Sequence, residues 1–266
     1  MHPSTAYTWD RGHRYEEYVG RWSRRVAPLF LAWLRIPAGR GWLDVGCGTG
    51  ALCEAILAHG SPSRVIGVDP AQGFLQAAKD NLADRALLCR GTAVEIPLED
   101  SAVDVVVSGL VLNFVPDPPA AVREMVRVVG GAGTIAAYVW DYAGRMELMR
   151  LFWDTAVELR PEAAREDEGV RFPLCRPPAL AELFGAAGLR GVDVTAMDIP
   201  TRFASFEDYW QPFLGGQGPA PGYTISLDEV ARARLRDRLQ ARLPVAADGS
   251  ISLTARAWAV RGTVNK

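Results

Sequence analysis

Short apolar stretches alternate with helical patterns over the first half of the chain. The apolar stretches are continuously hydrophobic rather than alternating, as expected of strands that are covered on both faces. The segments between them carry helix signals, such as Asp117 as an N-cap followed by Pro118 at the first helical position. The predicted strands are 41–45, 64–68, 86–89, 103–108 and 134–140, and the predicted helices are 49–58, 71–82 and 118–129. Because each parallel pairing needs a crossover, this order predicts a doubly wound α/β fold with helices on both faces.

The regular alternation of strands and helices ends after Trp140, and helical patterns dominate from there on. A helix over 145–159, a short helix over 178–187 and a strand over 191–199 precede Ser205, which is placed to cap a further helix. The glycine-rich segment 215–222 is the most flexible by composition and is a candidate lid. Ser226 and Glu229 predict a capping box for a helix that ends near Leu243, and 250–260 predicts a closing strand.

These elements predict a single domain over 1–266. Its expected parts are an N-terminal helical arm (1–40), a cofactor-binding core (41–140), a cap or insertion with late sheet elements (141–225), and a C-terminal helix with the closing strand (226–266).

Composition narrows the possible partners. The chain has 49% hydrophobic residues, and 29 basic against 31 acidic residues leave a net charge of -2, so no global field attracts nucleic acid or an anionic membrane. No apolar run reaches the roughly 18 residues that a membrane span requires. The four cysteines lack C-x-x-C spacing and are interpreted as reduced thiols of a cytoplasmic protein.

Two segments carry candidate chemistry. The sequence LDVGCGTG places Gly46, Gly48 and Gly50 between the first strand and the first helix, where backbone can approach a ligand beside free helix N–H groups. The spacing differs from the G-x-G-x-x-G of dinucleotide-binding turns. Asp69 follows Gly46 by 23 positions at the end of the second strand, where a carboxylate can accept both hydroxyls of a ribose. Together these segments predict an adenosine-containing cofactor.

The segments LDVGCGTG, VIGVDP, GTAVEIPLEDSAVDVVVSG and LNFVPD, in this order, resemble the class I S-adenosylmethionine-dependent methyltransferases. The resemblance is to the small-molecule branch around the ubiquinone/menaquinone and biotin-pathway enzymes, and it covers about Tyr15 to Trp140. It implies a Rossmann-like, mainly parallel seven-stranded sheet with a reversed last strand. It also implies transfer of a methyl group from S-adenosylmethionine to a small molecule, with S-adenosylhomocysteine as product.

The same resemblance implies a set of cofactor contacts. They are Asp44, Gly46, Cys47 and Gly48 around the methionine part, Asp69 on the ribose, Pro70, Thr92 and Ala93 around the adenine, Ser108 and Gly109 at the amino-acid end, and Tyr15, Arg21 and Trp22 in a covering arm. Thr92 stands where the family usually has Asp, although a hydroxyl can accept the same hydrogen bond.

Acceptor contacts are expected at the carboxyl edge of the sheet, where open α/β folds bind ligands. Asn113 and Phe114 follow the fourth strand, and Trp140, Asp141 and Tyr142 follow the fifth. The family often has His where Asn113 stands, and Asn cannot act as a general base. Asp141, Tyr142 and His13 are the catalytic candidates, with helix capping an equal alternative for Asp141. Tyr209 and Trp210 either line an apolar pocket or belong to the core, and the core is favoured.

Several alternatives remain open. A tRNA or protein methyltransferase of the same fold is disfavoured by the near-neutral charge and by the lack of an N-P-P-Y motif, while a catalytically silent cofactor-binding scaffold is the alternative from another class. The arginines of 226–243 recur at every second position and predict a solvated surface rather than a nucleic-acid patch. No Asp-Asn pair follows Asp141, so no metal is expected. The protein is expected to be a monomer or a homodimer.

Overall fold

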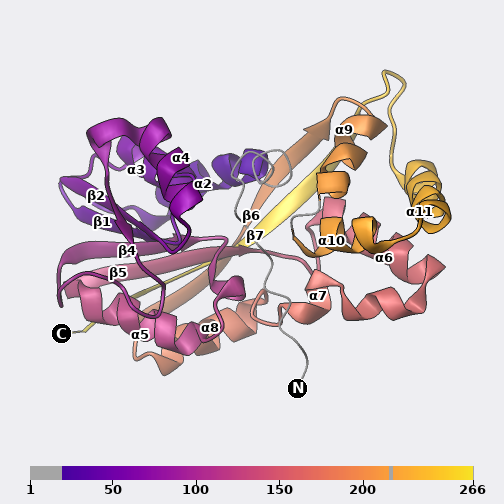
Figure 1. Ribbon diagram of the computed structural model, residues 1–266. Helices are drawn as coiled ribbons and strands as arrows, with labels where there is room; N and C mark the ends of the chain where they lie inside the picture. Colours follow the sequence, from indigo (N-terminus) through magenta and orange to yellow (C-terminus); the bar gives the residue numbers. More distant parts are fainter. Residues whose placement is uncertain (1–19, 216–217, 266) are drawn as a thin grey trace.

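Seven strands form one sheet in the computed structural model, which describes residues 20–215 and 218–265 (Figure 1). The strand order is β3-β2-β1-β4-β5-β7-β6. All neighbours pair in parallel except β7, which runs antiparallel to both β5 and β6. The predicted seven-stranded sheet with a reversed last strand is therefore confirmed. The strands are β1 (Gly41–Val45), β2 (Arg64–Asp69), β3 (Leu87–Arg90), β4 (Val103–Gly109), β5 (Val129–Trp140), β6 (Arg190–Phe203) and β7 (Ile251–Thr263).

Helices cover both faces of this sheet. The helices α2 (Arg21–Leu34), α3 (Ala51–His59) and α4 (Gln72–Leu82) lie on one face, and α5 (Pro118–Val128) and α8 (Pro177–Ala186) lie on the other (Figure 1). Every residue of β1 is buried, in agreement with its continuous apolar pattern. The main core therefore lies within the helix–sheet–helix layers.

The remaining helices form a cap around the far end of the β6–β7 pair (Figure 1). They are α6 (Glu147–Leu159), α7 (Glu168–Arg171), α9 (Phe206–Trp210), α10 (Pro219–Ser226) and α11 (Glu229–Arg242), with short 3-10 turns η4 (Pro161–Arg165) and η5 (Gln211–Gly215). The β6 strand continues beyond the predicted end at Ile199 as far as Phe203, which pairs with Ile251. The proline at 200 is tolerated because β6 is the edge strand of the sheet.

One prediction in the cap, the capping box at Ser226, is wrong. Asp228, not Ser226, caps α11 by accepting the N–H of Ala231 at 2.7 Å, while the Ser226 hydroxyl donates to the Tyr223 carbonyl. Part of the glycine-rich segment is helical, because α10 begins at Pro219, a residue suited to the first helical turn. The lid prediction rests on a segment whose residues 216–217 lie outside the described residues. By contrast, Ser205 caps α9 as predicted.

The arginines of α11 contact acidic groups within the cap. Arg238 and Arg242 both bind Glu158 of α6, at 2.6 and 2.8 Å, and Arg236 binds Glu207 at 2.6 Å. Ion pairs within the chain therefore balance part of the positive charge of these arginines. Within the described ranges, no helix has both the length and the apolar character needed to cross a membrane.

Candidate functional site

A cavity of about 460 Å³ lies at the carboxyl ends of β1, β2 and β4. The turn after β1 and the segment after β4 both contribute residues to its lining. The predicted residues that line it are Asp44, Gly46, Cys47, Gly48, Asp69, Pro70, Thr92, Ala93, Gly109 and Phe114. The structure therefore brings together most of the residues that the sequence assigned to a cofactor.

The turn after β1 is shaped by its glycines. The N–H groups of Gly46 and Cys47 both donate to the Val68 carbonyl of β2, at 2.7 and 3.0 Å. Gly46 has φ +76°, and a Cβ there would lie 2.5 Å from a methyl group of Val111. At Gly48, with φ +53°, a Cβ would meet nothing within 4 Å. Glycine at 46 thus allows close packing, and glycine at 48 leaves the cavity side of the turn open.

Asp69 joins this turn to the next helix. One carboxylate oxygen accepts the N–H of Gly48 at 3.0 Å, and the other accepts the N–H of Ala71 at 2.8 Å. Burial raises the pKa of Asp69, and the two backbone hydrogen bonds oppose that rise. A carboxylate oxygen can accept more than one hydrogen bond, so both oxygens retain capacity for a ligand in the cavity.

Asp44 is the more unusual carboxylate of the site. It is 1% exposed on β1, and the Cys53 thiol donates to its Oδ2 at 3.3 Å. Its Oδ1 is buried without a hydrogen-bond partner. Burial, reinforced by the nearby charge of Asp69, raises the pKa of Asp44 to about 7. An unpaired buried carboxylate oxygen is costly, so this position favours a cationic or hydrogen-bond-donating ligand group.

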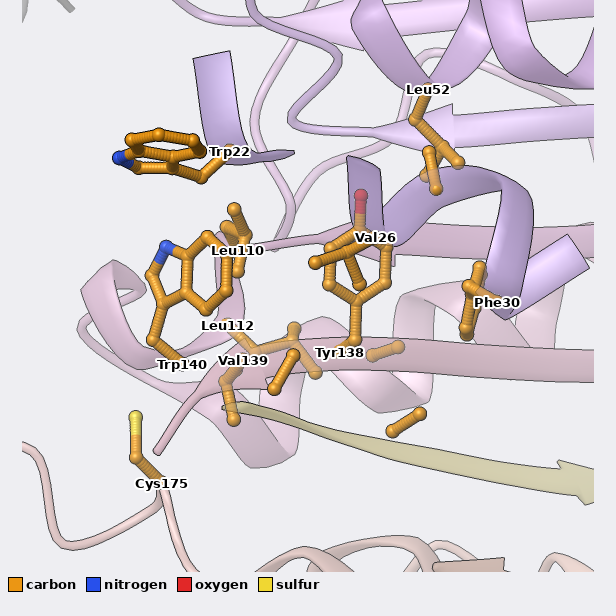
Figure 2. Packing of buried hydrophobic residues seen from close by; sticks show 14 of the residues in the cluster. Trp22, Val26, Phe30, Leu52, Leu110, Leu112, Tyr138, Val139, Trp140 and Cys175 are labelled. Carbon is orange, nitrogen blue, oxygen red and sulfur yellow. The ribbon is translucent and has the colours of Figure 1, made fainter. Parts of the chain in front are cut away.

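Sequence reasoning missed the wall formed by Leu110, Val111 and Tyr138. Leu110 has φ +62°, an uncommon conformation for a residue other than glycine, and its N–H donates to the Tyr138 carbonyl at 2.7 Å. A Cβ at Gly109 would lie 2.6 Å from the Tyr138 hydroxyl oxygen, so glycine there lets the phenol ring cross β4. Strand alternation could have identified Tyr138, because it shares a face of β5 with Trp140 (Figure 2).

Other predicted cofactor residues do not line the cavity. The Ser108 hydroxyl is buried and donates to the Val45 carbonyl at 2.8 Å, which ties β4 to β1. Arg21 pairs with Asp208 of α9 at 2.9 Å, and its guanidinium lies over the Trp22 ring, 4.5 Å from the centroid. His13 and Tyr15 lie outside the described residues.

The predicted acceptor residues fall into separate environments. Phe114 meets Phe172 edge to face at 5.0 Å, and Phe172 contacts Tyr142 at 5.5 Å, so an aromatic row leads from the cavity toward the cap. Asp141 is 6% exposed and accepts the N–H of Arg145 at 2.8 Å in the turn before α6. The predicted capping of the following helix is wrong, because the N-cap residue of α6 is Met146 and no side chain caps that helix. Trp140 is 1% exposed.

Tyr209 and Trp210 belong to the core, the interpretation that the sequence favoured. They are 1% and 3% exposed, and the Tyr209 hydroxyl donates to the Leu148 carbonyl at 2.9 Å. All four cysteines are free thiols. Across the part of the chain that is described, no group of three or more His, Cys, Asp or Glu side chains is placed to hold a metal ion.

Comparison with known proteins identifies the core. The methyltransferase domain family matches residues 43–137. These residues are therefore similar to a methyltransferase domain. A demethylmenaquinone methyltransferase of Oceanobacillus iheyensis is 37% identical over 110 residues, which cover 38% of this chain and 45% of that relative. The chain thus spans about half the length of the curated relatives that it matches.

Solved structures resemble the whole fold of this chain. A phosphoethanolamine N-methyltransferase 2 of Haemonchus contortus, in complex with S-adenosyl-L-methionine, has a TM-score of 0.61 at 16% identity, covering 99% of this chain and 59% of that one. The [4+2]-cyclase SpnF has a TM-score of 0.56 at 17% identity, covering 98% and 87%. At this identity the likeness concerns the fold alone.

Proposed function

We propose that the chain transfers a methyl group from S-adenosylmethionine to a small-molecule acceptor by in-line displacement. The observation that carries the proposal is the unpaired buried oxygen of Asp44 beside the glycine turn and Asp69. The methyltransferase domain match supports the reaction class. The name of the demethylmenaquinone methyltransferase relative supports a small acceptor.

The cavity residues fit the parts of this cofactor. Asp44 offers a carboxylate to the ammonium of the amino-acid end, which is the partner that its Oδ1 lacks. Asp69, held by two backbone N–H groups, offers its remaining capacity to the ribose hydroxyls. Pro70, Thr92 and Ala93, which also line the cavity, are the proposed contacts of the adenine. When bound, the cofactor supplies a methyl group that is already activated on a sulfonium.

The remaining work of the protein is positioning and exclusion of water. The apolar side chains of Leu110, Val111 and Phe114 line the cavity wall nearest the aromatic row. They remove water from the reacting atoms and restrict the acceptor to one approach. As the bond from the methyl carbon to the acceptor forms, its bond to sulfur breaks, and any proton that the acceptor loses passes to solvent. A dedicated base is not required.

Calorimetric titration tests the cofactor claim. We expect the wild-type protein to bind S-adenosylmethionine and S-adenosylhomocysteine. Asp69→Ala should weaken both by at least about tenfold, because a hydrogen bond to a charged group contributes about 1.5–3 kcal/mol. Asp69→Asn keeps one accepting oxygen for the turn, so this variant separates a loss of cofactor affinity from a loss of folding. Asp228→Ala, which removes a helix cap in α11, is the matched control and should leave both affinities unchanged.

Two results would count against the proposal. Failure of the wild-type protein to bind either compound overturns it entirely. Binding without methyl transfer to any member of a panel of quinones, phenols, amines and acids favours the silent-scaffold alternative. A labelled methyl group on S-adenosylmethionine makes that second assay independent of the acceptor's own chemistry.

A further inference from the structure

The segment between β3 and β4 begins with a loop that folds back on itself at the cavity. The lining residues that it contributes are Gly91, Thr92, Ala93 and Val94. Thr92 and Glu95 exchange two backbone hydrogen bonds, each 3.3 Å long. A Cβ at Gly91 would lie 2.5 Å from Cδ of Pro97, so the two ends of this turn pack closely together. Residues 91–98, the 91–98 loop, therefore form a compact turn whose first half lines the cavity.

A carboxylate and a guanidinium of α5 bind the second half of this loop. Glu124 Oε2 accepts the N–H of Ile96 at 3.0 Å. Arg127 donates from Nη2 to the Ile96 carbonyl at 2.9 Å and from Nη1 to the Leu98 carbonyl at 2.7 Å. The side chain of Ile96 is itself buried. Two side chains of one helix thus bind the backbone of the loop through both its donors and its acceptors.

The two side chains of α5 are also fixed to each other. Arg127 donates to Glu124 from Nε and from Nη2, each at 2.8 Å, and such a bidentate pair is strong and directional. The hydrogen bond with Arg127 lowers the pKa of Glu124, so the carboxylate stays charged at neutral pH. Isolated ion pairs near a surface contribute little. This pair differs from them because each partner also binds the backbone of the loop.

The pair acts at a distance from any ligand. Glu124 and Arg127 lie outside the described lining of the cavity, and α5 covers the other face of the sheet from α3 and α4 (Figure 1). The two side chains can therefore affect a bound molecule only through the loop. A loop that is held at Ile96 and Leu98 loses less conformational freedom when a ligand arrives, and such preorganisation lowers the cost of binding.

We propose that Glu124 and Arg127 are positioning residues of the cofactor site, which order the 91–98 loop for the adenine. This inference rests on the proposed function, which assigns Thr92 and Ala93 to the adenine. Without the pair the loop adopts other conformations, and the apparent affinity for the cofactor falls in proportion to the fraction of molecules in which the loop is ordered. The pair contributes to affinity without touching the cofactor.

Calorimetry with S-adenosylhomocysteine tests the effect on affinity. Arg127→Gln should weaken binding by about tenfold or more, the equivalent of one hydrogen bond to a charged group. Glu124→Ala should also weaken binding, whereas Glu124→Gln keeps an oxygen for the Ile96 N–H and should retain part of the lost affinity. Arg232→Gln is the matched control, because Arg232 likewise donates to two backbone carbonyls, those of Thr224 and Leu227 in the cap. Its affinity should equal that of wild type.

Amide hydrogen exchange locates the effect within the site. In Arg127→Gln without ligand, the amides of Thr92, Glu95 and Ile96 should exchange faster than in wild type, because their hydrogen bonds open more often. The amides of Gly46 and Cys47, which bind the Val68 carbonyl, should keep their wild-type rates. Saturation with S-adenosylhomocysteine should slow exchange in the loop again, since the ligand stabilises the ordered conformation.

The possible failures are distinguishable. If the wild-type protein does not bind S-adenosylhomocysteine, the proposed function fails, whatever the loop does. If it binds, an affinity of Arg127→Gln within about twofold of wild type overturns the positioning role, even where the variant is less stable. Weaker binding with unchanged exchange in the loop, or with equally faster exchange at Gly46 and Cys47, also overturns it. Should Arg127→Gln fail to fold, the comparison of Glu124→Ala with Glu124→Gln decides by the same criteria.

Discussion

Glu168 is a buried carboxyl group at the start of α7 that should make stability depend on pH. It is 2% exposed, and the Trp153 indole N–H donates to one of its oxygens. The neighbouring Asp167, which Arg150 binds at 2.8 Å, adds a negative charge. Burial, with this charge as a smaller contribution, raises the pKa of Glu168 from 4.5 to about 8.

The sign of the effect follows from proton linkage. Between the two pKa values the unfolded chain has released the Glu168 proton, while the folded chain retains it. Raising the pH through this window therefore favours the unfolded state. Because one pKa unit corresponds to about 1.4 kcal/mol, the whole change from 4.5 to about 8 sets an upper limit of roughly 5 kcal/mol. The part lost between pH 6 and pH 8 is about 2–3 kcal/mol.

The isosteric variant Glu168→Gln removes the titration and keeps an oxygen for the Trp153 N–H. Relative to wild type, its free energy of unfolding should rise by about 2–3 kcal/mol from pH 6 to pH 8, or roughly 5–10 °C in melting temperature. Urea unfolding at a series of pH values measures the difference. Glu182→Gln, at an exposed position on α8, is the control and should follow wild type. Parallel stability curves for wild type and Glu168→Gln over this range would refute the reasoning.

Three further predictions concern the site and its support. Asp44→Asn should abolish most affinity for S-adenosylhomocysteine in calorimetry. Because the pKa of Asp44 is raised to about 7, wild-type affinity should fall about tenfold for each pH unit below 7, whereas the variant's affinity should not vary with Asp44 protonation. Gly46→Ala should lose about 1–3 kcal/mol in urea unfolding, since the new methyl group would meet Val111 at 2.5 Å; unchanged stability would contradict the packing argument. Tyr209→Phe should lose about 1 kcal/mol, because the Leu148 carbonyl loses its donor, with unchanged cofactor affinity; weaker cofactor binding would show that Tyr209 is more than a core residue.

Local signals made the cofactor half of the site predictable. The strand predicted over 41–45 has the observed bounds of β1, because a buried parallel strand followed by a glycine turn is marked within a few residues. Gly46 directly follows β1 and Asp69 ends the neighbouring strand β2, so their proximity follows from the parallel order. The structure adds the reason for the glycine at 46, which is the close approach of Val111.

The rest of the site and the cap depend on contacts between segments that are distant in the sequence, and hydrophobic periodicity does not predict such contacts. Arg21 was expected to cover the cofactor, yet its partner Asp208 lies 187 residues away in the cap. The predicted capping box at Ser226 is wrong because α10 ends at that residue. The Ser226 hydroxyl therefore donates to a carbonyl of α10 instead of capping α11. Leu110 carries no sequence signal for its positive φ, and the carbonyl that its N–H contacts belongs to Tyr138, a residue 28 positions further along the chain.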